Sequence, residues 1–324
     1  MSSNSISGYA IVIAWPTTLC KQVNSWYDPM MNAIGIAKNH FYKVGHAAIV
    51  LIDSETSAAH YFDFGRYHAP YGFGRARCAD TDPELALKSK PVINLKTNTL
   101  VNYSQILIEL QSSDVFHGFG NLHSAYTSID FKNAYDKAMS LVNESPIKYG
   151  PFQKGGSNCS RFVCDILNAG RLNWWQKIKL NFFIPLTPTT LTNVRAFGNK
   201  RVLEKQFDEI NFCPPKPTKE WLNNTLPAPV RPKNLPIQAQ WLAGEGQGSW
   251  FWVKQVSNAK IRLGRYSALG ATEFEADFEE ENGHFINQNA PFFITYMSDY
   301  RRVTIRQKGI KYIFNRVKNK VTIK

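Results

Sequence analysis

The chain has 324 residues, of which 44% are hydrophobic and 13% aromatic, so it is long enough to form one large or two ordinary folded domains. This composition excludes an intrinsically disordered chain. The formal net charge of +13 indicates an affinity for anionic partners, such as nucleic acid, an anionic membrane surface or an acidic cell-wall polymer.

The beginning of the chain predicts mostly strands. Residues 9–15 form a short apolar run that is typical of a buried strand. Residues 19–37 predict a helical stretch that Pro29 interrupts. Two β-branched and aromatic runs, residues 45–53 and 60–67, flank a polar turn, so they predict an antiparallel hairpin.

The next segments predict a loop, a further strand and two helices. Residues 67–77 are rich in glycine and aromatic residues, which favours a loop, and residues 90–95 predict a strand. Helices are predicted over residues 102–111 and 128–143, and Asp130 falls in the first turn of the second helix. Strands and helices together indicate an α+β domain.

A helix with a thiol in its first turn is predicted over residues 159–169. Ser157 or Asn158 is a suitable N-cap, and Gly170 suits a left-handed stop. Cys159 projects from the apolar face that this helix must bury. The N–H groups and the positive dipole end at a helix start favour a thiolate, which is the reactive form of cysteine. A small buried cysteine that only fills space is the alternative.

The cysteines do not predict a disulfide framework or a metal site. They are Cys20, Cys78, Cys159, Cys164 and Cys213. Cys159 and Cys164 are five residues apart on one predicted helix, so their side chains face different directions. We therefore expect no disulfide, no metal and no cofactor, and a reducing compartment.

The N-terminal residues do not resemble a targeting segment. Residues 1–9 have no basic region, and the apolar run at residues 10–15 is too short for a signal peptide or a membrane span. We therefore expect a cytoplasmic protein without a transmembrane segment.

A tryptophan-rich segment at residues 172–185 allows two interpretations. Trp174 and Trp175 stand beside Lys177 and Lys179. The segment is either a packing element with lysines at its edge, or a membrane-surface element whose aromatic rings lie at the interface and whose lysines face the lipid headgroups.

A proline-rich stretch divides the chain. Seven prolines occur between residues 213 and 236, which is typical of an extended connector. We predict a first domain over residues 1–204, a linker over residues 205–236 and a small all-β domain over residues 237–324. Its alternating segments, typical of antiparallel strands, are residues 261–266, 272–278, 292–296, 302–307 and 311–315.

The second domain is basic at its end. From Arg301 onward, every charged residue is Lys or Arg. We expect this charge to affect the encounter with an anionic substrate or surface. The chain shows no RNA-binding aromatic motif and no zinc-finger spacing, so the sequence does not favour nucleic acid as the partner.

The order of a histidine and the cysteine helix carries a family resemblance. Gly45-His46 opens an apolar strand with a hairpin partner, and Asn158-Cys159 opens a helix only later in the chain. This order resembles the circularly permuted papain-like (NlpC-like) cysteine hydrolases, the branch that includes lecithin retinol acyltransferase-like enzymes. The resemblance covers roughly residues 8–200. It implies an antiparallel sheet packed on the Cys helix, and a cysteine nucleophile served by a histidine base.

The predicted hairpin register selects a third polar group. Folding Asp53 against Ala58 places Asp63 on the same face as His46, where it can hold the imidazole ring. His60 has the opposite parity and lies on the other face under this register. A bulge or a different turn would exchange the two roles.

Cys159, His46 and Asp63 are therefore the predicted catalytic residues. We expect hydrolysis or transfer of an acyl group through a Cys159 thioester, with His46 as base and then acid and Asp63 as its orienting group. The resemblance implies an amide bond in a peptide or peptidoglycan fragment as the target. A lipid acyltransferase or thioesterase of the lecithin retinol acyltransferase-like type, and a non-enzymatic binding module, are the alternatives.

The loop after the hairpin offers further candidates. Four of its residues could line the substrate cleft, namely Arg66, Tyr67, Tyr71 and Arg75. The arginines are suited to a carboxylate or phosphate. A loop held in place by its own aromatic side chains is the alternative.

Overall fold

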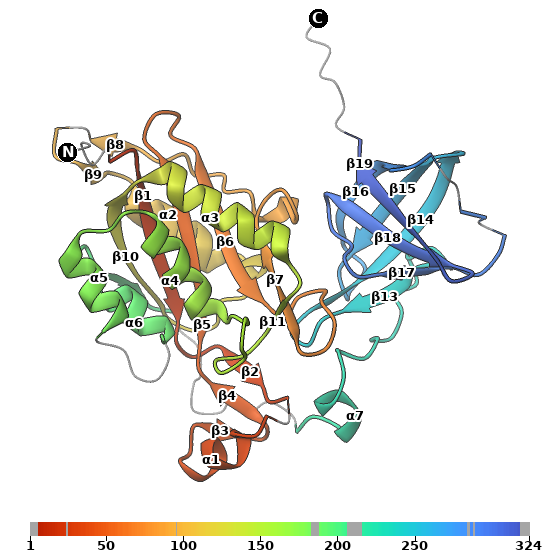
Figure 1. Ribbon diagram of the computed structural model, residues 1–324, viewed down its shortest axis with the longest axis horizontal. Coiled ribbons are helices and arrows are strands. Elements are labelled where there is room, and N and C mark those ends of the chain that lie inside the picture. Colours follow the sequence, from red (N-terminus) through yellow and green to blue (C-terminus); the bar gives the residue numbers. More distant parts are fainter. Residues whose placement is uncertain are drawn as a thin grey trace, which may run out of the picture. The chain divides into compact units, whose positions relative to one another are not determined.

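The protein is a mixed α/β molecule with a separate, nearly barrel-shaped all-β region at its C-terminal end (Figure 1). The computed structural model describes residues 6–23, 25–94, 96–182, 188–205, 216–283, 286–287 and 289–317. The chain divides into two compact units. The first unit comprises residues 1–65, 74–79 and 85–223, and the second comprises residues 66–73, 80–84 and 224–324.

These units differ in their boundaries from the predicted domains. Two short segments from the first half of the chain, residues 66–73 and 80–84, belong to the second unit. The later part of the predicted linker, residues 216–223, belongs to the first unit and includes the short helix α7 (Lys219–Leu222). The predicted linker residues 206–215, which include Cys213, lie outside the described residues.

The first unit is built on one seven-stranded sheet. Its strands follow the order β11-β7-β6-β5-β1-β10-β12, and the pairs from β7 to β12 are antiparallel. Their bounds are β1 Gly8–Trp15, β5 His46–Asp53, β6 Ala59–Gly65, β7 Phe73–Arg77, β10 Leu122–Ile129, β11 Ile147–Lys148 and β12 Arg201–Leu203. The predicted buried strand over residues 9–15 and the predicted hairpin are thereby confirmed.

Helices cover both faces of this sheet (Figure 1). One face packs on α3 (Phe131–Glu144), α4 (Cys159–Ala169) and α6 (Thr190–Arg195), and the other packs on α2 (Tyr103–Ser112). All eight residues of β1 are buried because successive side chains enter opposite cores. Each fully buried aliphatic side chain contributes about 1.5–3 kcal/mol to folding, so this central strand anchors the unit.

The hairpin adopts the predicted register. Ala48 pairs with Asp63, and the Asp53 N–H donates to the Ala58 carbonyl, so the turn closes where the sequence predicted. Asp63 therefore lies on the same face of the hairpin as His46, and His60, which pairs with Leu51, lies on the other face.

The segment between β1 and β5 differs from its prediction. In place of a broken helix, it forms β2 (Leu19–Lys21), the short helix α1 (Asp28–Ala33), β3 (Ala37–Lys38) and β4 (Phe41–Lys43). The three strands form a separate sheet in the order β2-β4-β3. Pro29 is the second residue of α1 and does not interrupt a helix, because a residue in the first helical turn needs no N–H partner.

Two strands of the main sheet were not predicted. β7 lies in the segment predicted as a loop, and β10 lies where no strand was expected. The helix predicted from residue 128 begins at Phe131 as α3, with Asp130 as its N-cap. Residues 90–95 contribute only β8 (Ile93–Asn94), which pairs with β9 (Thr99–Leu100); Leu95 lies outside the described residues.

The second unit is a seven-stranded antiparallel sheet that curls toward closure. Its order is β13-β14-β15-β16-β19-β18-β17, and the Gln240 amide on the first of these strands bonds to the backbone of Phe292 and Ile294 near the last. The bounds are β13 Gln240–Ala243, β14 Gly248–Ser257, β15 Lys260–Tyr266, β16 Thr272–Glu280, β17 Phe293–Thr295, β18 Arg302–Gln307 and β19 Ile310–Arg316. The predicted alternating segments are confirmed as strands.

The two early segments of the second unit are held by buried ion pairs. Arg66 Nη1 lies 2.7 Å from Glu245 Oε2. Arg265 is fully buried and donates to Asp82 at 2.9 Å and to Glu84 at 2.5 Å. Residues 66–73 and 80–84 are thus fastened within this unit at the two places where the chain leaves and re-enters the first unit.

No helix among the described residues combines the length and the apolar character needed to cross a bilayer.

Candidate active site

The predicted cysteine helix begins at Cys159. Asn158 is its N-cap, because the Asn158 Oδ1 accepts the Arg161 N–H at 2.8 Å. The Arg161 guanidinium in turn donates to the carbonyls of Gly156 and Pro151, which fastens the loop that leads into the helix. Cys159 therefore sits in the first turn of a well-capped helix, where the N–H groups have no partner within the helix.

The end of this helix differs from its prediction. Gly170 is the C-cap, but its φ of −71° is not left-handed. A Cβ at this position would lie 3.3 Å from Ile129 and 3.4 Å from Ala134, closer than most real contacts. Glycine is therefore explained by close packing against β10 and α3, rather than by a left-handed stop.

His46 is the first residue of β5 and faces Trp15 on β1. The two residues are register partners, and their rings stack at 5.9 Å with an interplanar angle of 14°. The preceding Gly45 has a φ of +80°, and a Cβ there would lie 2.8 Å from the Trp15 carbonyl oxygen. The backbone thus explains why glycine precedes His46, since only glycine fits the turn that places the histidine.

Asp63 lies beside the imidazole. Its Oδ2 is 3.2 Å from His46 Nε2. The Arg77 guanidinium grips the same carboxylate with two bonds, Nε to Oδ1 at 2.9 Å and Nη2 to Oδ2 at 2.6 Å, and the Tyr61 hydroxyl donates to Oδ2 at 3.1 Å. Asp63 and Arg77 are both buried and are register partners on β6 and β7. The carboxylate therefore has a fixed position.

These contacts keep Asp63 ionised and His46 protonated. Burial alone would raise the pKa of Asp63, but the Arg77 charge and the His46 hydrogen bond hold it well below its usual range. Burial would lower the pKa of His46, but its hydrogen bonds with Asp63 and Cys159 and the charges of these two groups raise it to about 9. The imidazole is thus charged at neutral pH.

The Cys159 thiol completes the group. Burial would raise its pKa, but the hydrogen bond and the charge of His46 lower it, helped by a backbone hydrogen bond from Ala47. Because Nε2 of His46 faces Asp63, Nδ1 is the nitrogen left for the sulfur. A thiolate beside an imidazolium is the state that these contacts favour, and it is the nucleophilic state of cysteine.

His60 lies on the other face of the sheet from His46. Its ring packs against Tyr135 at 5.0 Å and Phe131 at 5.9 Å, both on α3. The structure thus brings Cys159, His46 and Asp63 together and leaves His60 elsewhere. The role of Asp63 as the orienting group stays a prediction about activity, but Asp63 alone of these two candidates touches the imidazole.

Three contributors escaped the sequence analysis, namely Arg77, Tyr61 and Trp15. Arg77 was hidden because residues 67–77 were predicted as a loop. As a strand paired with β6, the same segment places Arg77 opposite Asp63. Alternation along the hairpin also puts Tyr61 on the face of Asp63, so a signal for Tyr61 was present in the sequence.

The two arginines proposed for a substrate cleft are buried, and Arg66 is held in an ion pair. Arg66 pairs with Glu245 within the second unit. Arg75 is fully buried, and Tyr67 is 7% exposed. The aromatic-rich segment is thus largely packed, as the alternative interpretation of this loop holds.

The remaining described cysteines differ from Cys159. Burial and the Asp165 charge raise the pKa of Cys164 to about 11, so this thiol stays protonated at neutral pH. Cys20 is partly exposed, and Cys78 is buried. Within the described part of the chain, no three His, Cys, Asp or Glu side chains are grouped so that they could hold a metal ion.

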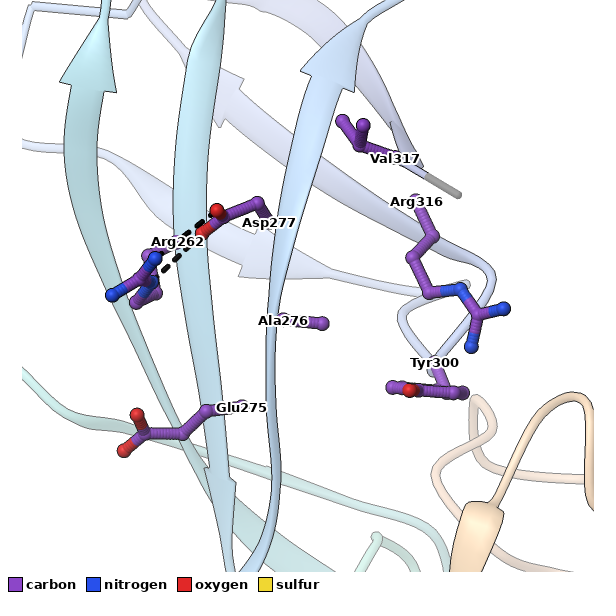
Figure 2. A pocket seen from close by; sticks show the side chains of 7 residues that line it. All are labelled: Arg262, Glu275, Ala276, Asp277, Tyr300, Arg316 and Val317. Atoms are coloured by element: carbon purple, nitrogen blue, oxygen red, sulfur yellow. Dashed lines mark hydrogen bonds and ion pairs between the residues drawn. The ribbon is translucent and has the colours of Figure 1, made fainter. Parts of the chain in front are cut away.

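The second unit contains a separate hollow of about 470 Å³ (Figure 2). Arg262 and Asp277 form a two-bond ion pair on one side of it. The Arg316 guanidinium lies 4.1 Å from the centroid of the Tyr300 ring on the other. None of the described lining residues is a cysteine, serine or histidine, so they offer no nucleophile comparable to Cys159.

Comparison with known proteins gives two family matches. A family model described as "Type VI secretion system effector TseH-like" matches residues 10–173, just over half of the chain. A second, described as the "DUF6695 C-terminal domain", matches residues 239–317. No protein with a curated description matches the chain.

One similar solved structure is the crystal structure of the type VI secretion system effector TseH. It is 18% identical in sequence, and the match covers 60% of this chain and 89% of that chain with a TM-score of 0.39.

Proposed function

Because the chain belongs to the family of TseH-like type VI secretion system effectors, we propose that it is an effector hydrolase that cleaves an amide bond with Cys159. The target we propose is a peptide or a peptidoglycan fragment. One observation carries this proposal, namely the buried chain of contacts from Cys159 through His46 to the Arg77-clamped Asp63. A cysteine that only filled space would need none of these partners.

Arg77 and Tyr61 serve the reaction by holding Asp63. The carboxylate accepts from the imidazole at one oxygen while the guanidinium occupies both oxygens, so the ring cannot turn freely. The Trp15 ring stacks on the His46 imidazole and limits how this ring can tilt. The histidine is thus held with Nδ1 toward the sulfur.

The first half of the proposed reaction forms a thioester. The Cys159 thiolate attacks the carbonyl carbon of the amide, and the carbonyl oxygen becomes an oxyanion. The His46 imidazolium then donates its proton to the amide nitrogen, the C–N bond breaks, and the amine leaves. The acyl group stays on the Cys159 sulfur, and the imidazole is neutral.

The second half restores the enzyme. The neutral imidazole takes a proton from water, and the water oxygen attacks the thioester carbon. The C–S bond breaks, which releases the carboxylic acid and returns the thiolate beside an imidazolium. The Cys159 N–H, in the first turn of α4, is the group we assign to the oxyanion, because the positive end of the helix dipole lies there.

The fold we propose for the first unit is a circularly permuted papain-like one. Its support is the order of the parts. The His46 strand and its hairpin precede the Cys159 helix, and that helix packs on the face of the antiparallel sheet. Basic residues of the second unit are proposed to attract an anionic substrate or surface.

Acyl transfer to or from a lipid is the second candidate function. The same thioester chemistry serves it, and the exposed Trp174 and Trp175 on α5 (Trp174–Asn181) favour contact with an apolar substrate over a purely packing role for this segment. A binding module without catalysis is the third candidate.

A two-substrate digestion separates these candidates. Wild type and Cys159→Ala are incubated with peptidoglycan fragments and, separately, with phospholipid vesicles, and the products are identified by mass spectrometry. We expect new amine and carboxyl ends in the peptide part of peptidoglycan with wild type only. Acyl release from phospholipid would transfer the proposal to the lipid enzyme. Identical products from both proteins on both substrates would contradict catalysis by Cys159.

A further inference from the structure

A small lobe extends from the end of the sheet that carries His46. Residues 16–45 leave the sheet at Trp15 and return at His46, and these two residues pair with each other. The lobe contains α1 and the three-stranded sheet β2-β4-β3, drawn in orange-red beyond the ends of β1 and β5 in Figure 1. It is therefore anchored next to the proposed catalytic histidine.

The surface of this lobe is unusually apolar. We call the following residues the apolar face: Trp26, Met30, Ile34, Ile36, Val44 and Phe152. Trp26 is 77% exposed and Ile34 is 59% exposed. Scattered apolar residues are normal on protein surfaces, but several large ones within one short segment indicate a contact surface.

Phe152 connects the apolar face to the loop that leads into α4. Its ring lies 5.9 Å from that of Trp26 and 5.2 Å from that of Tyr27. Phe152 follows Pro151, whose carbonyl accepts a 2.6 Å hydrogen bond from Arg161 on α4. The aromatic cluster thus joins the lobe, which precedes His46 in the sequence, to the loop that precedes Cys159 and is bonded to Arg161.

The charge of the lobe complements an anionic surface. Its one acidic residue, Asp28, is buried and accepts from the Ser25 N–H and the Tyr42 hydroxyl. From residue 29 to residue 52 the sequence contains no carboxylate. Lys38 and Lys43 are exposed on the same small sheet. Apolar and aromatic side chains flanked by lysines are typical of elements that lie in the interface of an anionic bilayer.

We propose that the apolar face docks the protein onto an anionic lipid bilayer. The apolar and aromatic side chains enter the headgroup region, and Lys38 and Lys43 contact lipid phosphates. Docking by this lobe would hold the His46 end of the first unit near the membrane surface. The proposal does not depend on catalysis, because no residue of the apolar face belongs to the group of Cys159, His46 and Asp63.

Vesicle flotation tests the proposal with the full chain. Wild type should bind vesicles of phosphatidylglycerol and phosphatidylcholine, and bind pure phosphatidylcholine at least tenfold more weakly. Trp26→Ser combined with Ile34→Ser should reduce binding at least tenfold, because each buried CH₂ contributes about 0.8 kcal/mol. Lys38→Glu combined with Lys43→Glu should also reduce it, without removing any apolar side chain.

Two matched controls make the result specific. Val101→Ser combined with Ile108→Ser removes two exposed apolar side chains from another part of the first unit, and it should leave vesicle binding unchanged. Cys159→Ala should bind vesicles like wild type whether or not the proposed reaction occurs. Wild-type binding by the Trp26 variant, loss of binding in the Val101 variant, or failure of wild type to bind anionic vesicles would each overturn the proposal.

Discussion

The proposed reactivity of Cys159 rests on two opposed effects at single residues. Burial favours the neutral thiol, and the His46 imidazolium favours the thiolate. The second effect prevails because the imidazolium is itself secured by Asp63, which Arg77 keeps ionised. The pKa of Cys159 therefore depends on the side chains of His46, Asp63 and Arg77 as well as on its own burial.

The pH dependence of thiol labelling and of turnover should reveal the Cys159 thiolate and the His46 imidazolium. The pKa of Cys159 is lowered, so its thiolate persists to lower pH than that of an ordinary thiol, and its iodoacetamide labelling rate should rise less steeply with pH than that of an ordinary thiol. The pKa of His46 is raised to about 9, so the imidazolium is lost as the pH rises through that value. Turnover should then fall near pH 9, because protonation of the leaving amine stops.

A short unstructured peptide with one cysteine provides the comparison for this measurement. Its labelling should rise about tenfold per pH unit below an ordinary thiol pKa of about 8.5. A parallel rise for Cys159 over the same range would show that no thiolate is preformed.

Removing the Asp63 charge should harm both stability and activity, for different reasons. Asp63→Asn leaves the buried Arg77 without its counter-charge, which costs about 3–5 kcal/mol of unfolding free energy. It should also lower turnover by about 10²-fold or more, because the imidazolium loses the carboxylate charge that stabilises and orients it. Thermal melting and single-turnover kinetics measure the two effects separately.

The double variant Asp63→Asn with Arg77→Met distinguishes them. It removes both charges of the pair, so most of the lost stability should return while activity stays low. His60→Ala is the matched control, since His60 packs on the other face. Full activity in the double variant, or loss of activity in His60→Ala, would remove Asp63 from its proposed role.

At the scale of elements, the start of α4 decides where the sulfur lies. Asn158 caps this helix, and Asn173 caps α5 by the same contact to the third residue of the helix. Replacing either Asn by Ala should cost about 1 kcal/mol of unfolding free energy. Only Asn158→Ala should also slow Cys159 labelling, because fraying there moves the thiol away from His46.

Chemical denaturation and iodoacetamide labelling of both cap variants check this expectation. If Cys159 is labelled equally fast in Asn158→Ala and Asn173→Ala, at equal loss of stability, the Asn158 cap has no specific part in placing the nucleophile.

The sequence predicts those elements whose signals are local. The hairpin register followed from a polar turn between two β-branched runs, and that register alone placed Asp63 on the face of His46. The cysteine helix followed from its cap and its apolar spacing. Both are short-range patterns that tertiary contacts do not overrule.

The strands β10 and β7 escaped prediction because tertiary pairing forms them. β10 contains polar residues such as Ser124 and Thr127, yet it pairs with β1 in the centre of the sheet. β7 contains a glycine and two arginines, both of them buried. Arg77 could not be predicted as part of the site until its strand was known.

At the scale of the whole molecule, the two units share the chain in an interleaved way. β7 brings Arg77 to Asp63, and it lies in sequence between the two early segments of the second unit, residues 66–73 and 80–84. Those segments are fastened by Glu245 and Arg265. Glu245 and Arg265 therefore hold the two chain segments that flank β7 in the sequence, and β7 carries Arg77 of the proposed site.

Truncation at Pro236 should consequently damage the protein. It removes Glu245 and Arg265, the ion-pair partners of the buried Arg66 and Asp82, and breaking each buried pair costs about 3–5 kcal/mol. We expect a lower melting temperature and loss of Cys159 labelling. A truncated protein that melts like the full chain and labels normally would support the independent domains over residues 1–204 and 237–324 that the sequence predicts.

The central claim is that Cys159 is a nucleophile activated by His46. A fluorescent thiol-directed acyl probe tests it most directly, with the labelled residue identified by peptide mass spectrometry. We predict that the probe acylates Cys159 much faster than Cys20 or Cys78, and that His46→Ala abolishes this preference while its fold, measured by circular dichroism, is retained. Labelling of Cys159 that is no faster than that of Cys20, or that is unchanged in His46→Ala, would contradict the account.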